Sequence, residues 1–299
     1  MDILEVRELK KSFGSKKVLD GVSFSVPENC IFGFIGRNGA GKTTTLRSVL
    51  GLLKIDGGEI KVCGEKVCYG STPKSGYIGF LPDVPEFYGY MNAREYLTLC
   101  GEISAIDEKE LKSRISELLE LVGLDKEKHR IKGYSRGMKQ RLGIAQAMIN
   151  RPKLLICDEP TSALDPVGRK DVLDILSAAK EHTSVIFSTH ILSDVERICS
   201  RVAFLEGGRT VFSGSLDEIR AARGNTDLEL TLSRPEDMDK VSSAFPEGKI
   251  SDGRFILHKA TDKDCAELMA FLSAQVIPVI RLERHEADLE DLFMEVVGK

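Results

Sequence analysis

The sequence predicts an α/β domain with a buried parallel sheet, followed by a smaller α+β domain. Three observations carry this prediction: apolar runs that recur along the chain, a glycine-rich loop directly after one of them, and a change of pattern near residue 222. The runs Cys30–Ile35, Leu154–Cys157 and Val185–Ser188 are almost continuously apolar. Strands covered by helices on both faces have this pattern, so these runs are expected to lie side by side in one sheet.

The composition is that of a globular protein with free thiols. The 299 residues are 42% hydrophobic and 29% charged, and the net charge of −4 argues against sequence-independent binding of nucleic acid. Seven cysteines include no C-x-x-C pair, which favours a reducing cytoplasm over a disulfide framework or a zinc site. The start, MDILEVRELKKSF, has no signal-peptide core, and the most apolar stretch, 268–280, is too short to span a membrane. Any membrane role is therefore expected to come through a partner.

Residues 36–43, GRNGAGKT, follow the first apolar run and fit the phosphate-binding pattern G-x-x-x-x-G-K-[ST]. A strand that ends at Ile35 and a helix that begins near Gly41 would leave backbone N–H groups free to bind an anion. Lys42 would reach the outer phosphates, and the Thr43 hydroxyl would bind the accompanying Mg²⁺. The alternative is a plain glycine-rich turn.

Two more apolar runs end in polar side chains. Asp158 and Glu159 follow one run, as a magnesium ligand and a group that polarises water would. His190 follows the other, at the sheet edge where α/β proteins bind ligands. The alternatives are exposed acids at a strand end and a structural histidine.

Helices and an appended domain complete the predicted organisation. Apolar residues at helical spacing in 111–122 predict a helical insertion at about 86–133, and Asp165 is expected to cap a helix that begins at Pro166. Residues 222–226 look like a linker. Within 227–299 the pattern is β-α-β-β-α-β, the ferredoxin-like arrangement, with strands expected at 276–282 and a last helix through 289–296.

Together with YSRGMKQR at 134–141, these motifs carry a resemblance to the ATPase subunit of ATP-binding cassette (ABC) transporters over residues 1–221. The resemblance implies a P-loop ABC ATPase that uses ATP and Mg²⁺, with Lys42, Glu159 and His190 in catalysis. The implied Mg²⁺ ligands are Thr43, Asp158 and Asp83. The implied ATP-binding residues are Phe13, Gly36, Asn38, Gly39, Ala40, Gly41, Lys42, Thr43 and Thr44.

Two segments depart from the family pattern. Ser135-Arg136-Gly137-Met138 stands where the family signature usually reads Ser-Gly-Gly-Gln, and Ser135 and Gly137 are implied to contact the nucleotide of the other subunit. Asp83 stands where the family generally has glutamine, and an ionised carboxylate accepts hydrogen bonds but donates none.

Phe13 stands where the family stacks an aromatic ring on adenine. Its alternative is a core phenylalanine.

The resemblance implies a homodimer, or a paired ATPase subunit, that closes around ATP, with the loop Ser162–Asp165 in contact with the other subunit. The dimer is implied to drive separate transmembrane permease subunits, with no direct contact to nucleic acid. The protein is then expected in the cytoplasm, held at the inner face of the cell membrane by the permease. The ending LEDLF at 289–293 is similar to ATPases of prokaryotic drug or antibiotic exporters, although an importer stays open. Residues 227–299 are expected to aid dimerisation or coupling, or to be a passive appendage.

Other classes fit less well. A soluble ABC ATPase on ribosomes usually carries two cassettes, whereas this sequence shows one. An ABC ATPase that repairs DNA carries a long coiled coil, and this sequence lacks the sustained heptads of one between its phosphate loop and Asp158. A GTPase would need an Asn-Lys-x-Asp motif, which the sequence lacks.

Overall fold

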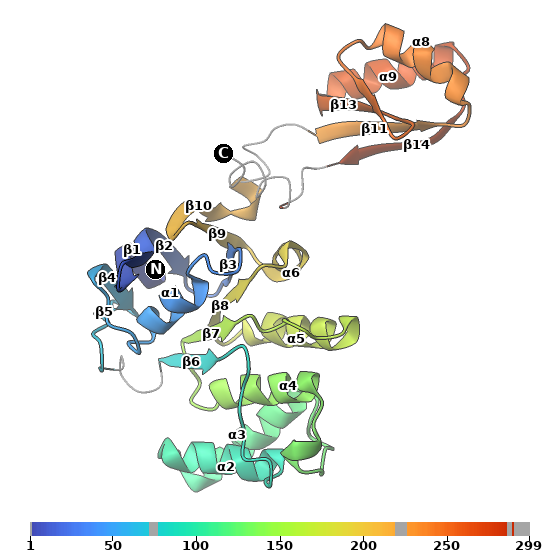
Figure 1. Ribbon diagram of the computed structural model, residues 1–299. Helices are drawn as coiled ribbons and strands as arrows, with labels where there is room; N and C mark the ends of the chain where they lie inside the picture. The colour runs from blue at the N-terminus through green and yellow to red at the C-terminus, as the bar shows by residue number, and fades with distance from the viewer. Residues whose placement is uncertain (1, 72–76, 219–225, 286–288, 290–299) are drawn as a thin grey trace. The chain divides into compact units, whose positions relative to one another are not determined.

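The computed structural model describes residues 2–71, 77–218, 226–285 and 289, and the chain divides into two compact units, Met1–Ser215 and Leu216–Lys299 (Figure 1). The linker expected at 222–226 lies largely outside the described residues. Thr226 already begins the first strand of the second unit. The predicted domain boundary therefore stays a prediction.

A six-stranded sheet with the order β10-β9-β3-β8-β7-β6 forms the centre of the first unit. All neighbours in this sheet are parallel except β10, which runs antiparallel to β9. Every residue of β3, β7 and β8 is buried, which confirms the strands predicted from their apolar runs. The strands are β3 (Ile31–Gly36), β6 (Ile78–Leu81), β7 (Leu154–Asp158), β8 (Ser184–Thr189), β9 (Arg201–Glu206) and β10 (Arg209–Ser215).

Strand register brings the predicted site residues to one edge of this sheet. Ile35 pairs with Thr189, and Asp158 pairs with Ser188. Because the strands are parallel, the loops that follow β3, β7 and β8 all leave from the same edge, where ligands of open α/β sheets bind.

A second, antiparallel sheet with the order β2-β1-β4-β5 covers part of the first. The ring of Phe24 stacks against Phe32 and Phe34 of β3, with centroids 5.7 and 4.9 Å apart, so the two sheets share one core. The β1–β2 hairpin turns at Gly14, whose φ of 59° suits glycine. The strands are β1 (Asp2–Phe13), β2 (Lys16–Pro27), β4 (Gly57–Val62) and β5 (Glu65–Lys66).

Helices flank the sheet, and α2, α3 and α4 lie beyond β6 at the end of the unit away from β10 (Figure 1). The apolar positions predicted for α3 are all buried. Asp165 caps α5 by accepting from the N–H of Gly168 at 3.1 Å, as expected. The helices are α1 (Lys42–Val49), α2 (Ala93–Ile103), α3 (Glu108–Leu121), the 3₁₀ turn η1 (Ile131–Gly133), α4 (Arg136–Ala147), α5 (Pro166–Ala179) and α6 (Leu192–Ile198).

The second unit has the predicted ferredoxin-like order, with a four-stranded antiparallel sheet β12-β13-β11-β14. Phe255 and the leucines of β11 are buried in its own core. The elements are β11 (Thr226–Leu232), η2 (Pro235–Asp237), α8 (Met238–Ala244), β12 (Lys249–Ser251), β13 (Arg254–Ala260), α9 (Asp262–Ala274) and β14 (Val279–His285).

One strand boundary differs from the prediction. The last strand begins at Val279 rather than at Val276, because Val276 has a left-handed φ of 52° just after the C-cap of α9. The final helix predicted through 289–296 lies outside the described residues except for Leu289. Among the helices that the structure describes, none is both long enough and apolar enough to cross a membrane.

Candidate active site

The glycine-rich loop connects β3 to α1 as predicted. Gly39 and Gly41 have φ values of 84° and 110°, a backbone region that glycine enters without strain. A Cβ at Gly36 would lie 2.6 Å from the carbonyl oxygen of Leu205, so only glycine fits there. The loop therefore keeps its backbone close to the cleft, with the N-terminus of α1 directed toward any anion in it.

This loop forms one wall of a cleft of about 780 Å³, a volume that suits a nucleotide. The predicted residues Lys42, Glu159, His190 and Asp83 all line it. The cleft is also lined by Asn38, Gly39, Ala40 and Gly41 of the loop, by Thr43 and Thr44 of α1, and by Lys16, Lys17, Val18, Glu206, Gly207 and Gly208.

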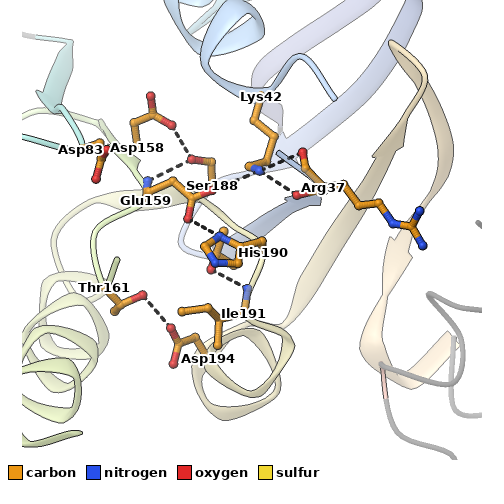
Figure 2. A network of polar contacts seen from close by, with 12 residues as sticks. Arg37, Lys42, Asp83, Asp158, Glu159, Thr161, Ser188, His190, Ile191 and Asp194 are labelled. Atoms are coloured by element: carbon orange, nitrogen blue, oxygen red, sulfur yellow. Dashed lines mark hydrogen bonds and ion pairs between the residues drawn. The ribbon is translucent and has the colours of Figure 1, made fainter. Parts of the chain in front are cut away.

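Lys42, Glu159 and His190 form a continuous polar chain (Figure 2). The Nζ of Lys42 lies 3.0 Å from Oε1 of Glu159, and Nδ1 of His190 lies 2.9 Å from Oε2 of the same carboxylate. Lys42 Nζ also donates to the carbonyl oxygen of Gly36 at 2.6 Å. Only 6% of Lys42 is exposed, so its charge acts where water screens it weakly. The structure thus joins residues that follow three separate strands into one cluster.

The backbone of Glu159 is held in an uncommon conformation. Its φ is 49°, which is rare for a residue with a side chain. The N–H of Glu159 donates to Oγ of Ser188 at 3.0 Å, and that hydroxyl donates to Oδ1 of Asp158 at 2.6 Å. Ser188 therefore fixes both acids at the end of β7, a role that the sequence did not assign to it. Strain of this kind persists where surrounding contacts hold it, often at functional sites.

The predicted metal ligands supply only oxygen atoms, which is the donor set that Mg²⁺ prefers. Thr43 and Asp83 line the cleft, whereas Asp158 is not among its lining residues and is buried. These residues fit a magnesium ion that also binds phosphate oxygens.

Asp83 also borders a second hollow, a groove on the side of α4, and forms an ion pair with Arg136 of 3.6 Å between Oδ1 and the guanidinium. Burial raises the pKa of Asp83, the nearby Asp158 and Glu159 carboxylates add to the rise, and Arg136 opposes it. Two residues that depart from the family pattern therefore contact each other, which the sequence did not reveal.

Phe13 does not belong to the core, so the alternative offered for it is wrong. Half of its surface, 50%, is exposed at the tip of the β1–β2 hairpin. Phe13 is not among the residues that line the cleft, and its stacking on adenine stays a prediction.

The predicted signature residues lie outside this cleft. Ser135 caps α4 by accepting from the N–H of Met138 at 3.2 Å, and Gly137 sits in the first turn of that helix. Neither lines the cleft that contains Lys42.

Comparison with known proteins follows the same division of the chain. The ABC transporter family model matches residues 19–162, and the model of the ATP-binding protein DrrA1-3-like C-terminal domain matches residues 214–297. An uncharacterised ABC transporter ATP-binding protein of Bacillus subtilis, YxlF, is 38% identical over 310 residues, which cover 99% of each chain. The chain belongs to the ATP-binding proteins of ABC transporters. It is therefore an ABC ATPase that binds and hydrolyses ATP, in agreement with the resemblance.

Two further relatives of this ABC ATPase extend the comparison. The bacitracin transport ATP-binding protein BcrA of Bacillus licheniformis is 36% identical over 303 residues, covering 99% of this chain and 97% of BcrA. A solved structure of an ATP-binding subunit of an ABC transporter superposes with a TM-score of 0.66 and 32% identity, covering 74% of this chain and 93% of that one. The predicted fold class is confirmed, including the small C-terminal domain.

Proposed function

We propose that this ABC ATPase closes as a dimer around ATP and drives separate permease subunits that export a drug or antibiotic. One observation carries the proposal: Lys42, Glu159 and His190 share one cleft, while Ser135 and Gly137 lie outside it. A second copy would bring its signature helix to this cleft, and the helix N-terminus would then face the γ-phosphate. The name of BcrA supports the antibiotic class, and export is our inference.

In the proposed reaction, this chain mainly positions and neutralises charge. Lys42 exchanges the Glu159 carboxylate for phosphate oxygens when ATP enters, which leaves Glu159 free to polarise the attacking water. His190 contacts the other oxygen of Glu159 and would face the γ-phosphate. Thr43, Asp158 and Asp83 would hold Mg²⁺, which offsets phosphate charge when bound.

Asp83→Asn is expected to raise the Mg²⁺ concentration for half-maximal hydrolysis by on the order of severalfold, because it removes a charge and keeps the shape. ATP affinity should change by no more than about twofold, since Asp83 contributes no phosphate contact in this proposal. The measurement is a magnesium titration of ATPase rate and of ATP binding.

Glu86→Gln is the matched control for this titration. Glu86 lines the same groove as Asp83 but not the cleft, so its loss should leave the titration unchanged. An Asp83→Asn titration that overlays the wild type would remove Asp83 from the magnesium site.

The groove beside α4 is the surface that we propose for the permease. It has a volume of about 460 Å³ and is lined by Asp83, Val84, Pro85, Glu86, Phe87, Gly89, Ile131, Lys132, Arg136, Lys139 and Gln140. Exposed Tyr88 and Tyr90 lie nearby, with ring centroids 5.9 Å apart. Because Asp83 lines both the groove and the nucleotide cleft, nucleotide binding would be coupled to a partner bound in the groove. Binding there would place the ATPase in the cytoplasm at the inner membrane face.

Tyr90→Glu tests this surface and the transporter assignment. A carboxylate at a buried interface costs binding energy, so the membrane-bound fraction of the full chain should fall at least about tenfold. Sedimentation of source-cell membranes with quantitative immunoblotting measures that fraction.

Tyr69→Glu is the control, because Tyr69 is 64% exposed and Tyr90 is 63% exposed, but Tyr90 directly follows Gly89 of the groove, whereas no sequence neighbour of Tyr69 lines it. Unchanged membrane binding of Tyr90→Glu would exclude this surface. Sedimentation of the wild type with ribosomes instead of membranes would favour the soluble alternative.

The C-terminal unit is proposed to be a noncatalytic module that aids dimerisation or coupling. Its match to the DrrA1-3-like C-terminal domain is compatible with this role, because that domain is named as part of an ATP-binding protein.

A further inference from the structure

A buried carboxylate joins three segments beside the active site. Asp194 near the start of α6 is only 1% exposed. It accepts hydrogen bonds from Oγ1 of Thr161 at 2.6 Å and from Nε of Arg169 at 2.5 Å (Figure 2 shows the first). The same guanidinium donates to Oγ of Ser193 at 2.8 Å. A buried carboxylate is tolerated only with such partners, so these contacts hold the segments together firmly.

The joined segments are the ones that carry catalysis and the predicted dimer contact. Thr161 follows Glu159 closely in the loop after β7, and Asp194 follows His190 closely after β8. Arg169 lies in the first turns of α5, just beyond the loop Ser162–Asp165 that is predicted to meet the partner subunit.

Two hydrogen bonds, one on each side, therefore hold the segments that carry Glu159 and His190 together. On the strand side, Ser188 accepts from the N–H of Glu159. On the helix side, Asp194 ties the two loops through Thr161. Loss of the hydrogen bond between Thr161 and Asp194 would let these segments separate. The phosphate loop would stay intact, because neither Thr161 nor Asp194 lines the cleft.

We propose that Asp194 is a positioning residue, which sets the contact between Glu159 and His190 and links it through Arg169 to the dimer loop. The proposal rests on the function proposed above. Catalysis is sensitive to misplacement of about 1 Å, which can cost on the order of a hundredfold in rate. Loss of a hydrogen bond that Asp194 accepts should therefore lower kcat and leave ATP affinity unchanged.

Thr161→Val and Thr161→Ser form the test pair in the full chain. Valine keeps the size but removes the hydroxyl that Asp194 accepts from, so kcat should fall at least about tenfold while the ATP dissociation constant stays within about twofold. Serine keeps the hydroxyl and should restore kcat. If Thr161 served stability alone, Thr161→Val would lower the melting temperature but would not lower kcat selectively over ATP affinity, and Thr161→Ser would not restore kcat.

Arg197→Gln is the matched control. The pair of Arg197 and Asp174 also joins α6 to α5, at 2.9 Å, but its side chains are 42% and 54% exposed. Its loss should leave kcat unchanged. Should Thr161→Val not fold, Arg169→Lys carries the same test, because a lysine cannot reproduce the paired contact to Asp194 and Ser193.

A double substitution separates positioning from an independent effect. In a His190→Ala background, Thr161→Val should lower kcat much less than in the wild type, because the contact that it positions is already gone. Three outcomes would overturn the proposal. They are an unchanged kcat in Thr161→Val, an equal fall of kcat in Arg197→Gln, and effects of Thr161→Val and His190→Ala on kcat that are fully additive. Turnover retained by Glu159→Gln would instead overturn the proposed function itself.

Discussion

Glu159→Gln is expected to bind ATP normally and to lower turnover by at least about a hundredfold, the usual scale for loss of a general base. Glutamine keeps the size of the side chain and one oxygen that can still accept from Lys42, while its NH2 group takes the place of the oxygen that contacts His190. Its neutral amide cannot draw a proton from water. Phosphate release measures turnover, and a nucleotide titration measures binding.

The same variant should accumulate as an ATP-bound dimer, because closure persists when hydrolysis is blocked. Light scattering at saturating ATP detects the dimer. Glu206→Gln is the control: Glu206 lines the same cleft from the end of β9, so this change removes a similar charge without touching Lys42 or His190. A monomeric Glu159→Gln protein at saturating ATP would contradict the dimer proposal, and rapid hydrolysis would contradict the role of Glu159.

The central residues of the site could be predicted because topology alone brings them together. Lys42, Glu159 and His190 each follow a fully buried apolar strand, and the parallel order of β3, β8 and β7 forces their loops to one edge. The strand pattern and the glycine spacing contain this information, and no side-chain conformation is needed to reach it.

Contacts between distant side chains could not be predicted in the same way. Nothing in the spacing of Thr161, Arg169 and Asp194 indicates that they meet, since that depends on how α5 and α6 pack and on rotamers. The pairing of Asp83 with Arg136 is of the same kind. Val276 is apolar and therefore fits a strand pattern, but it follows the C-terminus of α9, where local backbone geometry outweighs β propensity.

Lys42→Ala is expected to weaken ATP binding by on the order of ten- to a hundredfold, because a charged hydrogen bond to phosphate contributes about 1.5–3 kcal/mol. Lys42 is the buried cation beside the loop, and its loss leaves Glu159 as an uncompensated negative charge near the phosphates. Equilibrium titration of the full chain with a fluorescent ATP analogue in the presence of Mg²⁺ measures the dissociation constant.

Arg47→Ala is the control, because it removes the same charge from an exposed position in the last turn of the same helix and should leave affinity within about twofold. Lys42→Ala also removes the hydrogen bond to Gly36, so the melting temperature is measured beside affinity. A folded Lys42→Ala protein that binds ATP as the wild type does would show that the phosphates lie elsewhere. Since the roles of Glu159 and His190 depend on where the γ-phosphate lies, that result would remove them as well.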